Sequence, residues 1–202
     1  MSNREIVLLN GKPGSGTSRL GYELERSHRS VEHISVGDTV RRIASKAISS
    51  WYEDDVIKHL QSPQTHALLS MEISFGIVEE ALYRADLVHT VLLDGFPRTV
   101  EQLEQLNELA QQSDRNIIGA ITTDVKDEVA LQRMLRRRER PISEIEAKQR
   151  LADYHAHIET IQETLSESYD SYHINTEGTK EVSIMMGATA LHEMRFAAPE
   201  KE

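Results

Sequence analysis

Short apolar runs alternate with longer stretches of helical periodicity along the chain, and this alternation limits the folds that the chain can adopt. In the longer stretches apolar residues recur every three or four positions, as at Leu103, Leu106 and Leu109, which is the spacing of one helix face. Strands that alternate with helices are typical of βαβ units, in which helices cover both faces of a parallel sheet. The expected strands are 5–9, 33–35, 90–96, 116–122 and 172–175, and the expected helices are 17–28, 71–86, 99–112, 125–138, 143–168 and 180–195. The sequence therefore predicts an α/β fold with a five-stranded parallel sheet between two helical layers.

Length and composition narrow the class of protein. A chain of 202 residues with 39% apolar residues suits one domain with a substantial core. The formal net charge of −10 argues against a general binder of nucleic acids or anionic membranes, because the overall field repels polyanions. No cysteine is present, which excludes disulfides and thiolate metal sites. Because neither a signal-peptide pattern nor an apolar span of about 18 residues occurs, we expect a cytoplasmic protein.

A glycine-rich turn, GKPGSGTS at residues 11–18, connects the first expected strand to the first expected helix. It follows the phosphate-loop pattern G-x-x-x-x-G-K-[ST] except that Thr17 stands at the lysine position. Glycines permit positive φ angles and close approach of the backbone to phosphate, and the helix N-terminus adds partial positive charge. The residues of the expected cradle are Gly11, Gly14, Ser15, Gly16, Thr17, Ser18 and Arg19. Taken alone, this stretch is either a phosphate cradle or a strand–helix turn without a ligand.

A second motif, DGFPRT at residues 94–99, follows an apolar strand. Since the carboxyl ends of parallel strands meet at one edge of a sheet, we expect Asp94 to lie beside the glycine-rich turn. The carboxylate of Asp94 would hold the hydration shell of Mg²⁺, Gly95 permits close backbone approach, and Arg98 offers a planar fork to a phosphate. Together the two motifs favour a nucleotide site.

The hexapeptide DGFPRT resembles the hallmark of adenylate kinases and their nucleoside monophosphate kinase relatives. The segments HISVGDTVRR (33–42), LLSMEI (68–73), RMLRRRER (133–140) and EAKQRLADYHAHIETI (146–161) are similar to further motifs of that family, in the family's order. The resemblance covers residues 5–190 and implies a three-layer P-loop NTPase fold as a single domain. It also implies a core of residues 1–35, 71–137 and 145–202, a helical insert that binds the nucleoside monophosphate (NMP) at about 36–70, and a short lid at about 138–144.

Phosphoryl transfer needs the reacting groups to be positioned in line and their negative charge to be neutralised. The resemblance implies which residues of this sequence would do so. The implied catalytic residues are Asp94, Arg98, Arg137, Arg140 and Arg150, and Arg133 would stack on the base of ATP. The implied AMP site consists of Val36, Arg41, Leu69, Gly95, Arg98 and Gln102. Asp38 and Asp94 would hold Mg²⁺ through water. The implied partners are ATP with Mg²⁺ and AMP, with no nucleic acid or membrane partner, and the chain is expected to be a monomer. The alternative for the arginine-rich run 133–140 is a solvated helix face.

Two departures from the family pattern leave alternatives open. Thr17 removes a charge from the loop, and loss of one preorganised donor costs roughly 10²–10³ in rate at an oxyanion site. Lys12, at a loop position that also carries a lysine in deviant Walker A ATPases, is the favoured replacement, because Arg19 lies about 200° around the helix from Thr17. Val36 stands where adenylate kinases usually have threonine, so CMP and UMP are alternative acceptors. The two hypotheses are a phosphotransferase that converts ATP and AMP into two ADP, and a catalytically weak nucleotide-binding protein that acts as a sensor or interaction protein.

Overall fold

A parallel sheet forms the centre of the computed structural model, which describes residues 4–48, 52, 54–60, 71–137 and 141–196. Its five strands lie in the order β2-β3-β1-β4-β5, and each neighbouring pair is parallel. The strands are β1 (Arg4–Gly11), β2 (Val31–Ser35), β3 (Thr90–Asp94), β4 (Arg115–Asp124) and β5 (Ser171–Asn175). The predicted fold class is confirmed.

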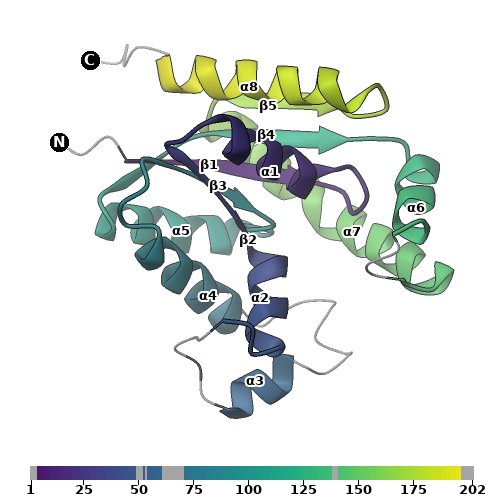
Figure 1. Cartoon of the computed structure of the whole chain (residues 1–202), viewed down its shortest axis with the longest axis horizontal. Coiled ribbons are helices and arrows are strands. Elements are labelled where there is room, and N and C mark those ends of the chain that lie inside the picture. The colour runs from purple at the N-terminus through teal and green to yellow at the C-terminus, as the bar shows by residue number, and fades with distance from the viewer. Residues whose placement is uncertain (1–3, 49–51, 53, 61–70, 138–140, 197–202) are drawn as a thin grey trace.

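Helices cover both faces of this sheet, as Figure 1 shows. The helices are α1 (Thr17–Ser27), α2 (Val36–Ala44), α3 (Asp54–Leu60), α4 (Met71–Arg84), α5 (Val100–Gln112), α6 (Asp127–Leu135), α7 (Glu144–Ser168) and α8 (Lys180–Phe196). Helices α1 and α8 pack on one face, whereas α4 and α5 pack on the other. No helix of the described ranges is long and apolar enough to cross a membrane.

The central strand β1 shows why the expected strands read as continuous apolar runs. Successive side chains of a strand point to opposite faces, and both faces are covered by helices here. Ile6 and Leu8 join the cluster under α4 and α5, and Val7 and Leu9 join the cluster under α1 and α8. All four are fully buried, and full burial of such a side chain contributes roughly 1.5–3 kcal/mol.

All expected strands and helices are present, and their ends differ from the expected ones by a few residues. The largest difference is at α6, which is expected over 125–138 and spans Asp127–Leu135. Helices α2 and α3 lie within the expected insert at 36–70, of which residues 49–51, 53 and 61–70 lie outside the described part. Val36, Val40 and Ile43 form the buried face of α2, and their spacing is that of a helix.

Candidate functional site

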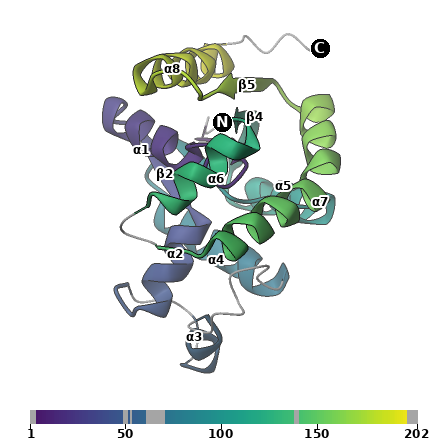
Figure 2. The same ribbon diagram turned by 90° about the vertical axis from the view of Figure 1, so that its right-hand side faces the viewer.

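The carboxyl ends of the strands lie along one edge of the sheet and bring the sequence motifs together. Leu9 of β1 pairs with Asp94 of β3, Ser35 of β2 pairs with Asp94, and Gly11 pairs with Thr123 of β4. Figure 2 looks onto this edge, with α6 lying across the strand ends. A cavity of about 350 Å³ opens there. The expected site residues that line this cavity are Gly11, Lys12, Gly14, Gly16, Thr17, Ser18, Arg19, Arg41, Asp94, Gly95, Arg98, Arg137 and Arg150.

Two glycines of the turn are required by its surroundings. Gly14 has a φ angle of +91°, and a Cβ atom there would lie 2.5 Å from the carbonyl oxygen of Ala130. At Gly11 the hydroxyl groups of Ser15, Thr17 and Thr123 occupy the space that a Cβ atom would need. The turn is therefore packed tightly against α6 and β4, so only glycine fits at these two positions.

Thr17, at the position of the missing lysine, is held beneath the turn by hydroxyl groups. Its Oγ1 lies 2.7 Å from Oγ1 of Thr123 and 3.1 Å from Oγ of Ser15, and the Ser15 and Thr123 oxygens are 2.8 Å apart. All three residues are buried. Thr17 thus joins the turn to β4 and adds no charge to the cavity.

Lys12 is held by two carboxylates at the end of β4 and the start of α6. Its Nζ lies 2.8 Å from Oδ1 of Asp127 and 3.1 Å from Oδ1 of Asp124. Oδ2 of Asp127 lies 2.9 Å from Nε2 of His155 on α7. Burial of Lys12 opposes its charge, but the hydrogen bonds to Asp127 and Asp124 outweigh burial and raise the pKa of Lys12. The lysine is therefore charged and connects the turn to α6 and, through Asp127, to α7.

Asp94 offers oxygen ligands that suit Mg²⁺. Ser18 donates a hydrogen bond from Oγ to Oδ2 of Asp94 at 2.7 Å, and Nε2 of His33 lies 3.3 Å from the same oxygen. Among the described residues no group of three or more acidic, histidine or cysteine side chains could enclose a metal. Mg²⁺ usually keeps several waters and takes one or two carboxylates together with substrate phosphates. Asp94 and Ser18 fit that mode of binding.

Arg98 is positioned by its own turn and faces a second arginine. Its Nε donates to the carbonyl of Gly95 at 3.1 Å, and its backbone N–H donates to Oε1 of Gln102 at 2.7 Å. Desolvation in the crowded cleft lowers the pKa of Arg98, and Arg150 lowers it further, against the influence of Asp94. Arg98 and Arg150 line the same cavity, so an anion bound in this cavity would relieve the repulsion between their like charges.

Arg133 lies behind the turn rather than on the cavity wall. Its guanidinium donates to the carbonyl of Thr176 at 2.6 Å and to the hydroxyl of Thr176 at 3.1 Å. The other expected site residues that do not line the cavity at the strand ends are Ser15, Val36, Asp38 and Gln102. Asp38 is ion-paired with Arg41 at 3.3 Å. Leu69 and Arg140 lie outside the described residues.

Several site residues did not emerge from the sequence. Asp124, Asp127 and Thr123 surround the turn, and Asp153 and Tyr154 of α7 line the cavity. Asp124 lies two residues after the end of the expected strand 116–122, and its position at a strand end is a signal that could have placed it at this edge.

Comparisons with known proteins agree with this geometry. The family model for adenylate kinase matches residues 9–171. Adenylate kinases of Staphylococcus aureus strains Mu50 and N315 are each 36% identical to this chain over 133 residues, which is 65% of this chain and 59% of those proteins. An adenylate kinase of Staphylococcus epidermidis is 35% identical over 133 residues, again with 59% of its length covered. The match thus spans less than two thirds of these relatives. The chain belongs to the adenylate kinase family.

Proposed function

We propose that this chain is a nucleoside monophosphate kinase that reversibly transfers the γ-phosphoryl group of ATP to AMP and releases two ADP. The observation that carries this proposal is the cavity at the strand ends, named the nucleotide cavity from here on, where the glycine-rich turn, Asp94 and several arginines converge. The proposal includes the insert at about 36–70 and the short lid at about 138–144 as the parts that enclose the nucleotides. The chain is expected to act as a monomer.

For this reaction the protein must position the two nucleotides and neutralise their charge, and it does not need to supply a general base. An oxygen of the acceptor phosphate forms a bond to the γ-phosphorus, and the bond from that phosphorus to the β–γ bridging oxygen breaks. The backbone N–H groups of the turn would hold the donor phosphates. Arg41, Arg98 and Arg150 would hold the acceptor phosphate in line, and their positive charge would stabilise the transferring group.

The Mg²⁺ that accompanies ATP would be held by Asp94 and Ser18 with the phosphates and water, and Asp38 belongs to the proposed set through water. When bound, Mg²⁺ neutralises charge on the β- and γ-phosphate oxygens. Asp94 is 7% exposed, and in this partly dry environment its charge acts on the cation more strongly than it would in water.

The experiment is an assay of ADP formation by the full chain with MgATP and, in turn, AMP, CMP, UMP and GMP. We expect AMP to be the best acceptor, with Gln102 and Thr99 beside the acceptor site as in adenylate kinases. Arg98→Gln should lower kcat/KM by roughly 10²–10³, whereas Arg29→Gln, in an exposed loop position, should leave it unchanged. ATP binding without turnover on any acceptor would contradict the proposal.

A second candidate function, a catalytically weak nucleotide-binding protein, is favoured by one specific observation. Thr17 is bonded beneath the turn and Lys12 is ion-paired with Asp124 and Asp127, so neither presents an unengaged charge to the phosphates. The variant Thr17→Lys separates the two functions. If catalysis is limited by the missing lysine, turnover should rise by roughly 10²–10³; if another group has replaced it, turnover should change little.

A further inference from the structure

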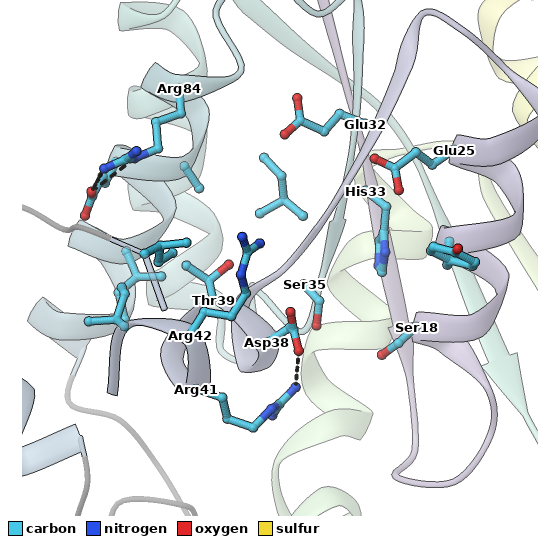
Figure 3. A pocket seen from close by; sticks show the side chains of 17 residues that line it. Ser18, Glu25, Glu32, His33, Ser35, Asp38, Thr39, Arg41, Arg42 and Arg84 are labelled. Carbon is cyan, nitrogen blue, oxygen red and sulfur yellow. Dashed lines mark hydrogen bonds and ion pairs between the residues drawn. The ribbon is translucent and has the colours of Figure 1, made fainter. Parts of the chain in front are cut away.

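A second cavity, of about 520 Å³, adjoins the nucleotide cavity beside the edge strand β2. Side chains of α1, β2, α2 and α4 line it, as Figure 3 shows. It shares Ser18, Ser35 and Arg41 with the nucleotide cavity, and it contains none of the glycines of the turn and neither Asp94, Arg98 nor Arg150. Its volume lies within the range of about 300–1,000 Å³ that is typical of small-molecule sites.

The charges that line this second cavity do not cancel. Arg41 is ion-paired with Asp38 at 3.3 Å, and Arg84 is ion-paired with Glu80 at 2.6 Å. The charged lining residues outside these pairs are Glu25, Glu32 and Arg42. Within the part of the chain that the structure describes, the side chains of these three form no hydrogen bond or ion pair. Two carboxylates and one guanidinium are therefore available to a ligand.

The two carboxylates lie on the same side of the cavity and repel each other. Figure 3 shows Glu25 of α1 and Glu32 of β2 together, with Arg84 on the opposite side and Arg42 rising from α2 between them. Burial and the neighbouring Glu25 raise the pKa of Glu32, against the influence of Arg115. A ligand with positive charge would relieve this repulsion.

The rest of the lining suits the carbon chain and polar groups of a small organic molecule. Ile43, Ile48, Ile77 and Ala81 contribute apolar surface. Among the described strands β2 pairs only with β3, so one edge of β2 is not paired with another of these strands, and the backbone N–H and C=O groups at this edge point away from the sheet. Ligand sites commonly combine apolar walls with a few polar groups that fix orientation.

We propose that this second cavity binds a basic amino acid, with its two cationic groups at Glu25 and Glu32 and its α-carboxylate at Arg42. The charges balance, because two carboxylates and one guanidinium meet two cations and one carboxylate. This inference goes beyond the proposed kinase function and does not depend on it, because Glu25, Glu32 and Arg42 are not among the residues proposed to bind the nucleotides or Mg²⁺.

The test is isothermal titration calorimetry of the full chain with L-arginine and L-lysine, without nucleotide. We expect saturable binding at one site. Glu25→Gln and Glu32→Gln should each weaken binding at least about tenfold, the effect of losing a charge-assisted contact. The matched control Glu104→Gln, at an exposed position of α5, should bind as the parent does.

Agmatine, which is arginine without its carboxylate, isolates the role of Arg42. Arg42→Gln should weaken binding of L-arginine but should not weaken binding of agmatine, because agmatine has no carboxylate for Arg42 to contact and is itself cationic. Circular dichroism verifies that each variant is folded. Absence of saturable binding by the parent chain, or equal affinity in the parent and in both glutamine variants, would overturn the proposal. Because no nucleotide is present, a failed kinase assay leaves this result unaffected.

Discussion

The charge of Lys12 is engaged by Asp124 and Asp127, yet Lys12 also lines the nucleotide cavity. A phosphate that enters the cavity would compete with these two carboxylates for the ammonium group. If Lys12 supplies the charge that Thr17 lacks, Lys12→Ala should lower kcat by roughly 10²–10³ and weaken ATP binding. Steady-state kinetics and ATP titration measure both effects.

The control for this prediction is Lys126→Ala, because Lys126 is exposed and ion-paired with Glu177 at 3.6 Å. A thermal melt separates loss of charge from loss of folding. If kcat and ATP affinity of Lys12→Ala equal those of the parent, the lysine does not replace the missing charge.

Asp127 makes the free energy of unfolding of the chain decrease at acid pH. The hydrogen bond from Lys12 and that from His155 lower the pKa of Asp127. Because the pKa of Asp127 is lower in the folded chain, the unfolded chain protonates this carboxylate first as the pH falls. The stability that the ionised Asp127 contributes is therefore complete above the usual Asp pKa of about 3.9, and it is lost as the pH falls through the lowered pKa of the folded chain. Urea unfolding should therefore show Asp127→Asn less stable than the parent at neutral pH, with a gap that narrows below about pH 4. The exposed control Glu108→Gln should unfold close to the parent at neutral pH; a constant gap for Asp127→Asn would contradict the prediction.

At the scale of elements, α5 holds the DGFPRT turn against the sheet. Thr99 caps this helix by accepting a hydrogen bond from the N–H of Gln102 at 3.2 Å. Gln102 in turn accepts the N–H of Arg98. The helix that packs on the core thus also positions an arginine of the nucleotide cavity.

Leu106 anchors α5, and its side chain is fully buried. Leu106→Ala removes apolar contacts and leaves a cavity, so urea unfolding should show a loss of about 2–5 kcal/mol in the free energy of unfolding. Leu87→Ala provides the control, because Leu87 is 98% exposed, and it should change stability by less than about 0.5 kcal/mol. A comparable loss in both variants would contradict the packing argument.

At the scale of the whole molecule, a chain with a formal net charge of −10 concentrates positive charge in one cavity. The cationic residues that line it are Lys12, Arg19, Arg41, Arg98, Arg137 and Arg150. The cavity is therefore lined by positive charge although the chain as a whole is negative. An acidic protein needs such a basic pocket to hold a polyanionic ligand.

Salt should therefore weaken binding of a polyphosphate ligand more than binding of an uncharged one. Between about 0.05 M and 0.5 M salt the screening length falls from roughly 14 Å to roughly 4 Å, and we expect the affinity for ADP to fall about tenfold. Adenosine is the control, because it carries no phosphate. Equal salt dependence for ADP and adenosine, measured by calorimetry, would show that the cavity does not act through its charge.

The parallel α/β fold and the position of the nucleotide cavity follow from local sequence patterns. A buried strand between helices has a continuous apolar run, and parallel strands place their carboxyl ends at one edge. The order of strand, glycine-rich turn and DGFPRT therefore sufficed to predict that the turn and Asp94 meet. Helices α2 and α3 were expected only as an unspecified helical insert, because such short helices contain few periodic positions.

The partners of Thr17 and Lys12 were decided by tertiary structure alone. Lys12 and Asp127 are 115 residues apart, and no local pattern joins them. Thr123 lies opposite Gly11 because the register between β1 and β4 shifts by one residue after Ile6; without this bulge Gly11 would face Thr122, whose side chain points to the other face of the sheet. The sequence by itself determined the fold and the edge at which the site forms, whereas the register of two strands distant in sequence decided which groups surround the turn.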